Sequence, residues 1–228
     1  MSSSRDQILN KLRSVRRPFE DAPLRPHSYL PVTVVEDETP EALLERFMRE
    51  LTALTCDVFP VEGDEAARDK VLELLEQHEA RSILTWDFAH IPVEGLESAI
   101  RATGIEIIQP DTHDEMRMEM LTASAEAQVG LTGADAAAAT TGTLIFTTAP
   151  GKGRIPTVFA PVHIAVITLD QLLPRLESWV AAQRAAGIPL QEQSNFCFIT
   201  GPSRTGDIEM QLILGVHGPG KVQVVIKR

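Results

Sequence analysis

The stretch VFPVEGDEAARDKVLELLEQHEARSILTW, residues 58–86, decides the fold class. It opens with a short apolar run at Val58–Val61, continues through a helical pattern at Asp64–Gln77, and closes with a second apolar run at Ser82–Trp86. Two strands separated by a helix of this length need a crossover connection, which makes them parallel strands of one sheet. We therefore predict an α/β protein.

The same alternation continues on both sides of this stretch. It predicts a strand at Val32–Val35, a helix at Pro40–Leu54, a helix at Val93–Thr103 and a strand at Ile105–Gln109. Such alternation indicates a central, mostly parallel sheet flanked by helices. Later segments are predicted as a strand end at Val129, a small-residue helix or turn at Ala134–Ala139, strands at Thr143–Thr148 and Val162–Ile167, a helix at Asp170–Ala186, and strands at Asn195–Thr200 and Lys221–Lys227.

The N-terminal part has a different character. Ser4 is placed to cap a helix through Arg16, in which Ile8 and Leu12 recur at helical spacing. The next segment, Arg17–Pro31, holds four prolines and little periodicity, which is typical of a linker. We expect an N-terminal helix and proline-rich linker over residues 1–30, followed by one main domain over residues 31–228.

The chain is acidic, with a formal net charge of −11. A nucleic-acid backbone or an anionic membrane surface repels such a protein at long range. The charge is unevenly spread, because residues 1–128 hold 13 basic and 26 acidic residues whereas residues 129–228 hold 8 basic and 6 acidic. We therefore expect neither nucleic acid nor membranes as general partners, and we expect any anion to bind in the C-terminal part.

Targeting signals and cysteines restrict the compartment and the cofactors. The sequence holds no run of about 18 apolar residues, and its N-terminus lacks the apolar core of a signal peptide. We expect a cytoplasmic protein without a membrane span. Cys56 and Cys197 lie in apolar runs, so we expect two buried, reduced thiols. An iron–sulfur cluster typically takes about four cysteines, so we expect none in this chain.

Glycines gather in the C-terminal part, where eleven of the fourteen lie within residues 130–220. The turn Gly201–Asp207 is the first candidate site, because glycine turns expose backbone N–H groups while arginine and hydroxyl groups add donors for a carboxylate or a phosphate. The alternative is an ordinary turn in which Arg204 pairs with Asp207 or Glu209. The residues expected to bind are Gly201, Ser203, Arg204, Thr205 and Gly206.

Two further glycine loops are candidates. In Gly215–Gly220, His217 beside Gly218 has an imidazole that can donate to an anion or move a proton, although a structural turn is the alternative. In Ala149–Arg154, Lys152 and Arg154 have the charge to close over a negatively charged group. A solvated, hairpin-like loop is the alternative for that segment.

The remaining polar features are weaker candidates. Thr141, Gly142 and Thr143 open a predicted strand, where ligand contact and a turn or capping role are both open. His163 opens an apolar strand, and we expect a satisfied, partly buried histidine rather than a base. The stretch Asp111–Glu115 has metal-ligating residue types, but no second cluster at ligand spacing accompanies it, so we expect no metal site.

Four motifs, in this order and at these separations, carry a family resemblance: GLTGADAAAATTGTLIF, PVHIAVI, FITGPSRTGDIE and GVHGPG. They resemble the LUD-domain family, specifically its lactate utilisation protein C branch, and the opening RDQILNKLR is also similar to that branch. The resemblance implies a fold similar to the sugar-phosphate isomerase and CoA-transferase superfold. It also implies two partners in the oxidation of L-lactate to pyruvate, an iron–sulfur oxidoreductase and a larger iron–sulfur LUD protein.

Two functional hypotheses follow. In the first, the chain is an accessory component of that lactate oxidation system and binds a small organic anion or a partner surface, with iron–sulfur clusters in the partner subunits alone. In the second, it is a free-standing acyl-CoA or sugar-phosphate enzyme, for which Glu209 and His217 are weak catalytic candidates. A purely structural role for the glycine turns is a third interpretation.

Overall fold

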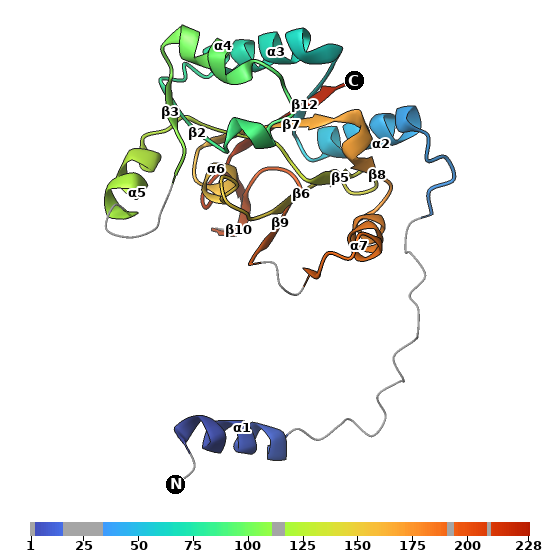
Figure 1. The fold of residues 1–228 in the computed structure, drawn as a ribbon, viewed down its shortest axis with the longest axis vertical. Helices are drawn as coiled ribbons and strands as arrows, with labels where there is room; N and C mark the ends of the chain where they lie inside the picture. Colours follow the sequence, from blue (N-terminus) through green and yellow to red (C-terminus); the bar gives the residue numbers. More distant parts are fainter. Residues whose placement is uncertain (1–2, 16–33, 111–116, 191–193, 209–210) are drawn as a thin grey trace. The chain divides into compact units, whose positions relative to one another are not determined.

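The computed structural model describes residues 3–15, 34–110, 117–190, 194–208 and 211–228 (Figure 1). The chain divides into two units, Met1–Val34 and Val35–Arg228. In the first unit, helix α1 spans Ser4–Val15 and exposes Ile8 and Leu12. The cap comes from Ser3 rather than the predicted Ser4, since the Ser3 hydroxyl accepts the Asp6 N–H at 3.2 Å. The predicted linker, residues 17–31, lies outside the described residues.

The second unit is built on a six-stranded sheet in the order β1-β12-β7-β4-β2-β3, and every neighbouring pair is parallel. This confirms the predicted α/β class with a central, mostly parallel sheet. Its strands are continuous apolar runs because helices and a second sheet cover both faces. The strands are β1 Asp57–Val61, β2 Ser82–Thr85, β3 Glu106–Ile108, β4 Val129–Thr132, β7 Val162–Thr168 and β12 Lys221–Lys227.

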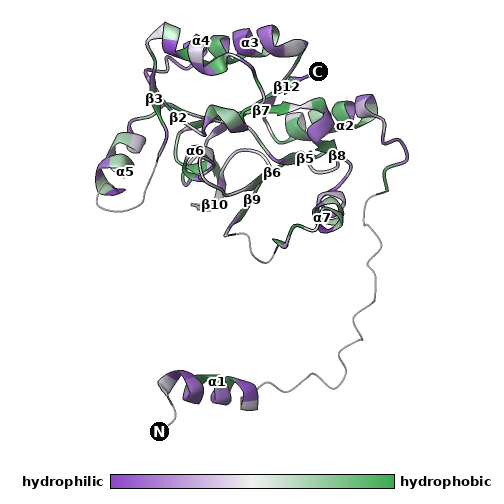
Figure 2. Cartoon of the chain, viewed as in Figure 1, coloured by the Kyte–Doolittle hydropathy of each residue, from purple (hydrophilic) through white to green (hydrophobic). Residues whose placement is uncertain are grey.

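Helices flank this sheet, as the sequence predicts. Figure 1 shows α3 and α4 on one face and α6 on the other. Helix α2 begins where the Thr39 hydroxyl accepts the Ala42 N–H and Pro40 takes the first turn. Hydrophobic residues concentrate on the strands and the helix faces turned to them (Figure 2). The helices are α2 Pro40–Ala53, α3 Gly63–Gln77, α4 Leu96–Thr103, α5 Arg117–Ala125, α6 Ile155–Val158 and α7 Leu176–Ala185, with short 3-10 turns at Phe88–His90 and Leu169–Gln171.

A second sheet of four strands has the order β8-β5-β6-β9. It combines parallel β5–β8 pairing with antiparallel β5–β6 and β6–β9 pairing. Two more strands, β10 and β11, pair only with each other among the described strands. These strands are β5 Ala136–Ala138, β6 Thr143–Thr147, β8 Leu172–Leu173, β9 Phe196–Ile199, β10 Arg204–Ile208 and β11 Gln211–Leu214.

Four sequence predictions need correction. Ala134–Ala139, predicted as a helix or turn, contains strand β5, because these buried alanines pair with β6 and tertiary packing overrides alanine's helix propensity. The helix predicted from Asp170 begins at Leu176, after a 3-10 turn and β8. The helix predicted from Val93 begins at Leu96. The strand predicted at Val32–Val35 lies partly outside the described residues, and its last two residues are not in a strand.

Candidate functional site

The order of strands identifies one place where loops separate at the carboxyl edge of the main sheet. From β2 the chain moves outward to β3, whereas from β4 it moves in the opposite direction to β7 and then β12. In open α/β sheets, ligands bind at such a switch point, outside the carboxyl ends of the strands. The loop Trp86–His90 after β2 and the loop Gly133–Asp135 after β4 meet here.

A buried lysine lies between these loops. The Lys152 side chain is only 10% exposed, and its ammonium group donates to an Asp135 carboxylate oxygen and, at 3.2 Å, to the Thr147 hydroxyl. It also lies 5.2 Å from the centre of the Trp86 ring, a cation–π contact. We call Lys152, Asp135, Thr147 and Trp86 the Lys152 cluster. The loop itself is exposed and hairpin-like, as the alternative interpretation has it, but the side chain of Lys152 is buried.

Hydrogen bonds hold the cluster in place. The second Asp135 oxygen accepts the Thr147 N–H at 2.5 Å and the Thr147 hydroxyl at 2.9 Å. The indole N–H of Trp86 donates to the Gly153 carbonyl at 2.7 Å, and the Asp87 N–H donates to the Gly151 carbonyl at 2.8 Å. The loop that carries Lys152 is thus fastened to the loop after β2, and its ammonium group is held in a defined position.

Two glycines permit this close packing. A Cβ on Gly133 would lie 2.3 Å from the His90 carbonyl oxygen, so no larger residue fits there without displacing the backbone. Gly151 has φ +73° and packs its Cα against Asp87 and His90. The glycines after β4 and in the Lys152 loop therefore bring three chain segments together.

The rim of the cluster offers a base. His90 is exposed, and its Nε2 lies 3.3 Å from the Pro150 carbonyl oxygen. Asp87 is also exposed, with one carboxylate oxygen accepting the Ala89 N–H at 2.9 Å. Cationic, anionic and imidazole groups thus lie around one switch point. That combination can bind a carboxylate, accept a hydrogen bond from a hydroxyl and move a proton.

His163 is fully buried on β7, more deeply than the sequence predicts. Its Nε2 pairs with the Thr132 hydroxyl at 2.9 Å, while Nδ1 has no hydrogen-bond partner among the described residues. The ring packs 5.8 Å from the Phe146 ring, between centres. Burial lowers the pKa of His163 to about 4, so the imidazole is neutral at neutral pH.

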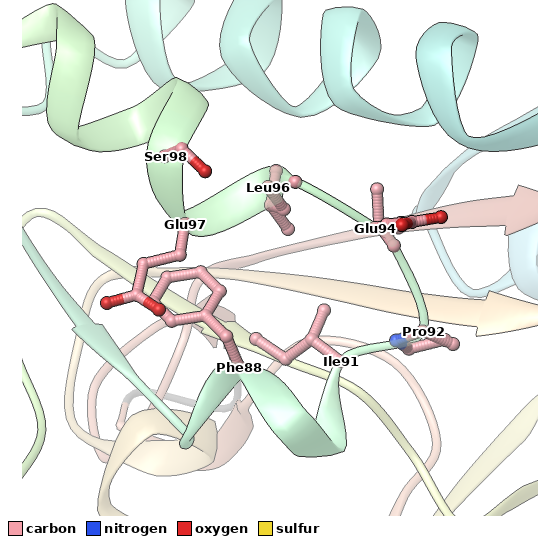
Figure 3. A pocket seen from close by; sticks show the side chains of 9 residues that line it. Phe88, Ile91, Pro92, Glu94, Leu96, Glu97 and Ser98 are labelled. Atoms are coloured by element: carbon pink, nitrogen blue, oxygen red, sulfur yellow. The ribbon is translucent and has the colours of Figure 1, made fainter.

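A surface pocket of about 450 Å³ lies outside the loop after β2, between the 3-10 turn and α4 (Figure 3). Phe88, Ile91 and Leu96 form its apolar part, and the Glu97 side chain extends alongside the Phe88 ring (Figure 3). Its charged lining residues are carboxylates, one of which, Glu97, pairs with Arg101 at 2.7 Å. An anion is repelled there, so this pocket is a poor candidate for the expected ligand.

The glycine turns predicted from sequence meet at the opposite, amino edge of the sheet. The Ser203 N–H donates to the Pro219 carbonyl at 2.8 Å, and the Gly215 N–H donates to the Ser203 carbonyl at 2.9 Å. Gly220, which precedes β12, donates to the carbonyl of Pro161, which precedes β7, at 2.9 Å. The two motifs are therefore neighbours in space, and part of their backbone hydrogen-bonding capacity is used within the protein.

Arg204 has a partner that the sequence did not indicate. Its guanidinium donates to the Leu54 carbonyl at 2.6 Å and lies 3.4 Å from the Thr55 hydroxyl. Leu54 is the C-cap of α2, so the cation lies where the helix dipole is negative. Gly201, with φ +85°, packs against the same leucine. Arg204 thus fastens the base of β10 to the end of α2.

The predicted threonines lie beside this region. Thr143 is buried, and its hydroxyl lies 2.7 Å from that of Thr141 and 2.8 Å from that of Thr200. Gly142 has φ +61°, and a Cβ there would lie 3.2 Å from the Leu51 nitrogen of α2. The hydroxyl chain therefore runs along the start of β6, next to the turn that contains Gly201.

The other predicted site residues are dispersed. Thr205 and Gly206 lie on β10, His217 is exposed, and Gly218 lies near Ser203 and α6. Arg154 precedes α6 and is exposed. Glu209 and Asp111–Glu115 lie outside the described residues. Within the described ranges, no three metal-ligating side chains lie together and no helix is long and apolar enough to cross a membrane.

Both cysteines are free thiols. Burial raises the pKa of the Cys56 thiol to about 11, although the charge of Arg204 opposes the shift. Burial also raises the pKa of Cys197, which is half-buried. Neither thiol is activated as a nucleophile. The prediction of buried thiols is thus confirmed for Cys56 and only partly met by Cys197.

Sequence reasoning missed Trp86, Asp87, His90, Asp135 and Thr147. A usable signal exists for most of them: Trp86 and Asp135 follow strands β2 and β4, whose carboxyl ends must lie at one edge of a parallel sheet. The glycine-rich loops drew attention to the C-terminal half instead. Of the predicted binding residues, Lys152 is the one that the fold brings to this edge as a buried cation.

Comparisons with known proteins agree on the family. The LUD domain matches residues 44–226. Lactate utilization protein C of Halalkalibacterium halodurans is 32% identical over 192 residues, 82% of this chain and 79% of that protein. The protein of the same name in an Exiguobacterium species is 32% identical over 209 residues, 90% of this chain and 86% of that protein.

A solved structure has the same fold. The crystal structure of a DUF162 family protein from Deinococcus radiodurans superposes with a TM-score of 0.61 at 18% identity, covering 84% of this chain and all of that one. At this identity the likeness concerns the fold alone. The domain match and the relatives cover most of the chain, and the chain therefore belongs to the LUD domain family.

Proposed function

We propose that this chain takes part in lactate utilization and that its Lys152 cluster binds the carboxylate of a small 2-hydroxy or 2-oxo acid. The names of relatives that share about a third of their residues over most of their length support the first part. The buried ammonium group of Lys152 at the switch point of the sheet carries the second. Lactate and pyruvate are acids of these two kinds.

A buried lysine is costly and needs compensation. Asp135 supplies a countercharge and Thr147 a hydrogen bond, which together occupy two of the three donor positions of the ammonium group. We propose that an incoming anion accepts from the third donor. Because low-polarity surroundings strengthen electrostatic attraction, one such donor beside the Trp86 ring supports a specific carboxylate contact.

The groups around the ammonium also suit the second functional group of such an acid. A hydroxyl needs an acceptor, and Asp135 beside Lys152 and His90 on the adjoining loop can each provide one. A cation for the carboxylate and an acceptor for the hydroxyl at one site distinguish a 2-hydroxy acid from a simple carboxylate such as acetate. His90 is the group placed at the surface to exchange a proton with solvent.

Oxidation of a hydroxy acid releases two electrons, which need an acceptor. This chain has two cysteines, too few to ligate an iron–sulfur cluster with thiolates alone. We therefore propose that the chain is an accessory component, and that an iron–sulfur oxidoreductase and a larger iron–sulfur LUD protein are its partners and hold the clusters. The slight excess of base in residues 129–228 supports anion binding in this half.

Calorimetric titration of the full chain with L-lactate, pyruvate, acetate and phosphate tests the ligand. We expect lactate or pyruvate to bind more tightly than acetate, and Lys152→Met to abolish that binding. Arg204→Met is the matched control, because it removes a cation at the other edge of the sheet. If Arg204→Met abolishes binding while Lys152→Met does not, the ligand belongs at the glycine turns and the proposal is wrong.

A separate assay addresses the free-standing enzyme. Among the described residues, no contact favours it over the accessory role: His217 is exposed, and Arg204 is bound to the end of α2. We expect the purified chain to convert neither CoA thioesters nor sugar phosphates. Turnover that is lost in His217→Gln would replace the accessory role by an enzymatic one.

A further inference from the structure

The β10–β11 ribbon exposes apolar side chains on both of its faces. Leu212, Ile213 and Leu214 are 64%, 36% and 44% exposed, and successive residues of a strand point to opposite sides. Val216 in the following loop is exposed too, and that loop approaches α6, where Val158 and Phe159 are exposed. We call these six residues the hairpin patch. An isolated two-stranded ribbon in water is marginally stable, so this patch needs a partner.

The ribbon is held to the rest of the protein at the base of β10, and no described strand pairs with either of its outer edges. Strand β10 contains Arg204 and Asp207, whereas β11 is uncharged. At the base of β10, Arg204 donates to the Leu54 carbonyl and the Ser203 N–H donates to the Pro219 carbonyl. Strand β11 pairs with β10 along one edge, and no described strand pairs with its other edge. That edge presents unpaired backbone N–H and C=O groups. It lacks the lysine or proline with which proteins usually protect exposed edges.

We propose that a second copy of this chain occupies this edge, with β11 pairing antiparallel to the β11 of its partner. The argument is charge: the chain carries a net charge of −11, but residues 210–216 hold no charged side chain. In a two-fold pair each strand faces itself, so like charges would be brought opposite one another. An uncharged, apolar strand in the less acidic half of an acidic protein is the surface where two copies repel least.

The pairing solves the stability problem of the ribbon. It joins two ribbons into one four-stranded sheet, in the order β10-β11-β11-β10, and satisfies the backbone groups along the β11 edge of each copy. The apolar residues of β11 then face their counterparts from the other copy on both sides of the new sheet. Val158, whose backbone lies against Gly218 in the loop after β11, is exposed and can extend the contact.

Sedimentation equilibrium of the full chain over a range of concentrations tests the proposal. We expect a dimer, and we expect Leu212→Asp to raise its dissociation constant at least about tenfold. Leu12→Asp is the matched control, because Leu12 on α1 is 63% exposed and Leu212 is 64% exposed. Thermal unfolding at low concentration confirms that both variants fold.

Hydrogen exchange distinguishes strand pairing from other dimers. In the dimer, the backbone N–H groups on the open edge of β11 are protected, and Leu212→Asp removes this protection. A chain that is monomeric at all concentrations overturns the proposal. A dimer that Leu12→Asp disrupts and Leu212→Asp does not also overturns it. So does a dimer in which the backbone N–H groups of the β11 edge exchange freely, because that edge would then be left for another protein.

Discussion

The main sheet has a cation at each edge, and the two are used differently. At the carboxyl edge Lys152 is buried against Asp135 and Trp86. At the amino edge Arg204 is exposed and donates to the last carbonyl of α2. Burying the Lys152 ammonium group lowers stability, and we expect such a cost only where the buried charge has another use. The contact of Arg204 with Leu54, in contrast, is an ordinary helix cap. This difference is the reason why we propose the ligand site at the carboxyl edge.

The glycines of the motifs differ in how tightly they are packed. At the carboxyl edge Gly133 leaves no room for a side chain because the His90 carbonyl lies against it. In the hairpin at the amino edge, a Cβ on Gly206 would meet no atom within 4 Å. A glycine in a motif is therefore not by itself a sign of close approach, and only the packing around it tells the two cases apart.

The largest expected effect comes from adding one methyl group at each edge. Gly133→Ala should lower the free energy of unfolding by about 3 kcal/mol, because the backbone of the loop after β2 must move away. Gly206→Ala should leave it unchanged within about 0.5 kcal/mol, since that position is open. Urea unfolding of both variants measures the difference. Equal losses would show that the close approach at Gly133 is unimportant.

The second largest loss of stability is expected on replacing the buried cation. Lys152→Met should cost about 2–3 kcal/mol, because it leaves the Asp135 carboxylate without its countercharge. Adding Asp135→Asn should recover part of this loss, which a double-mutant cycle reports as coupling. If the single and double variants show purely additive losses, the ion pair does not explain the burial of Lys152.

The buried imidazole of His163, on strand β7, predicts that the stability of the folded chain depends on pH. Its pKa is lower in the folded chain, about 4, than the 6.5 of a free histidine, so the unfolded chain takes up the proton first as the pH falls. The stability that the neutral imidazole of His163 contributes is complete above pH 6.5, and it is lost as the pH falls toward 4. At pH 5 the loss should be about 2 kcal/mol. His163→Gln should remove this component from unfolding curves at pH 5 and 7, and identical pH profiles for both proteins would contradict it.

The smallest effect is expected at the exposed cation. Arg204→Met should cost less than about 1 kcal/mol, because an exposed guanidinium at a helix C-terminus is well hydrated. Thermal unfolding beside Lys152→Met gives the comparison directly. A loss at Arg204 as large as that at Lys152 would mean that the tie to α2 holds the hairpin more firmly than its exposure indicates.

The sequence predicted the sheet better than the site. Apolar runs such as Ser82–Trp86 and Val162–Ile167 are buried on both faces. They can therefore be identified as strands from their own residues, without knowledge of the strands beside them. The prediction for Ala136–Ala138 was wrong because three successive alanines show no hydrophobic periodicity. They form a strand only because they pair with Ile145 and its neighbours. Of the three glycine loops that the sequence offered as candidates, two lie together at the amino edge and the loop with Lys152 lies at the carboxyl edge.

The sequence by itself determined the α/β class, the family motifs and the uneven charge, because these depend on residues close together in the chain. Only the tertiary structure decided that Asp135, Lys152 and Trp86 form one cluster, and that Arg204 is bound to Leu54 across 150 positions. The reason is physical: the edge at which a loop lies depends on the order of strands in the sheet. That order is set by long-range packing, which no local pattern contains.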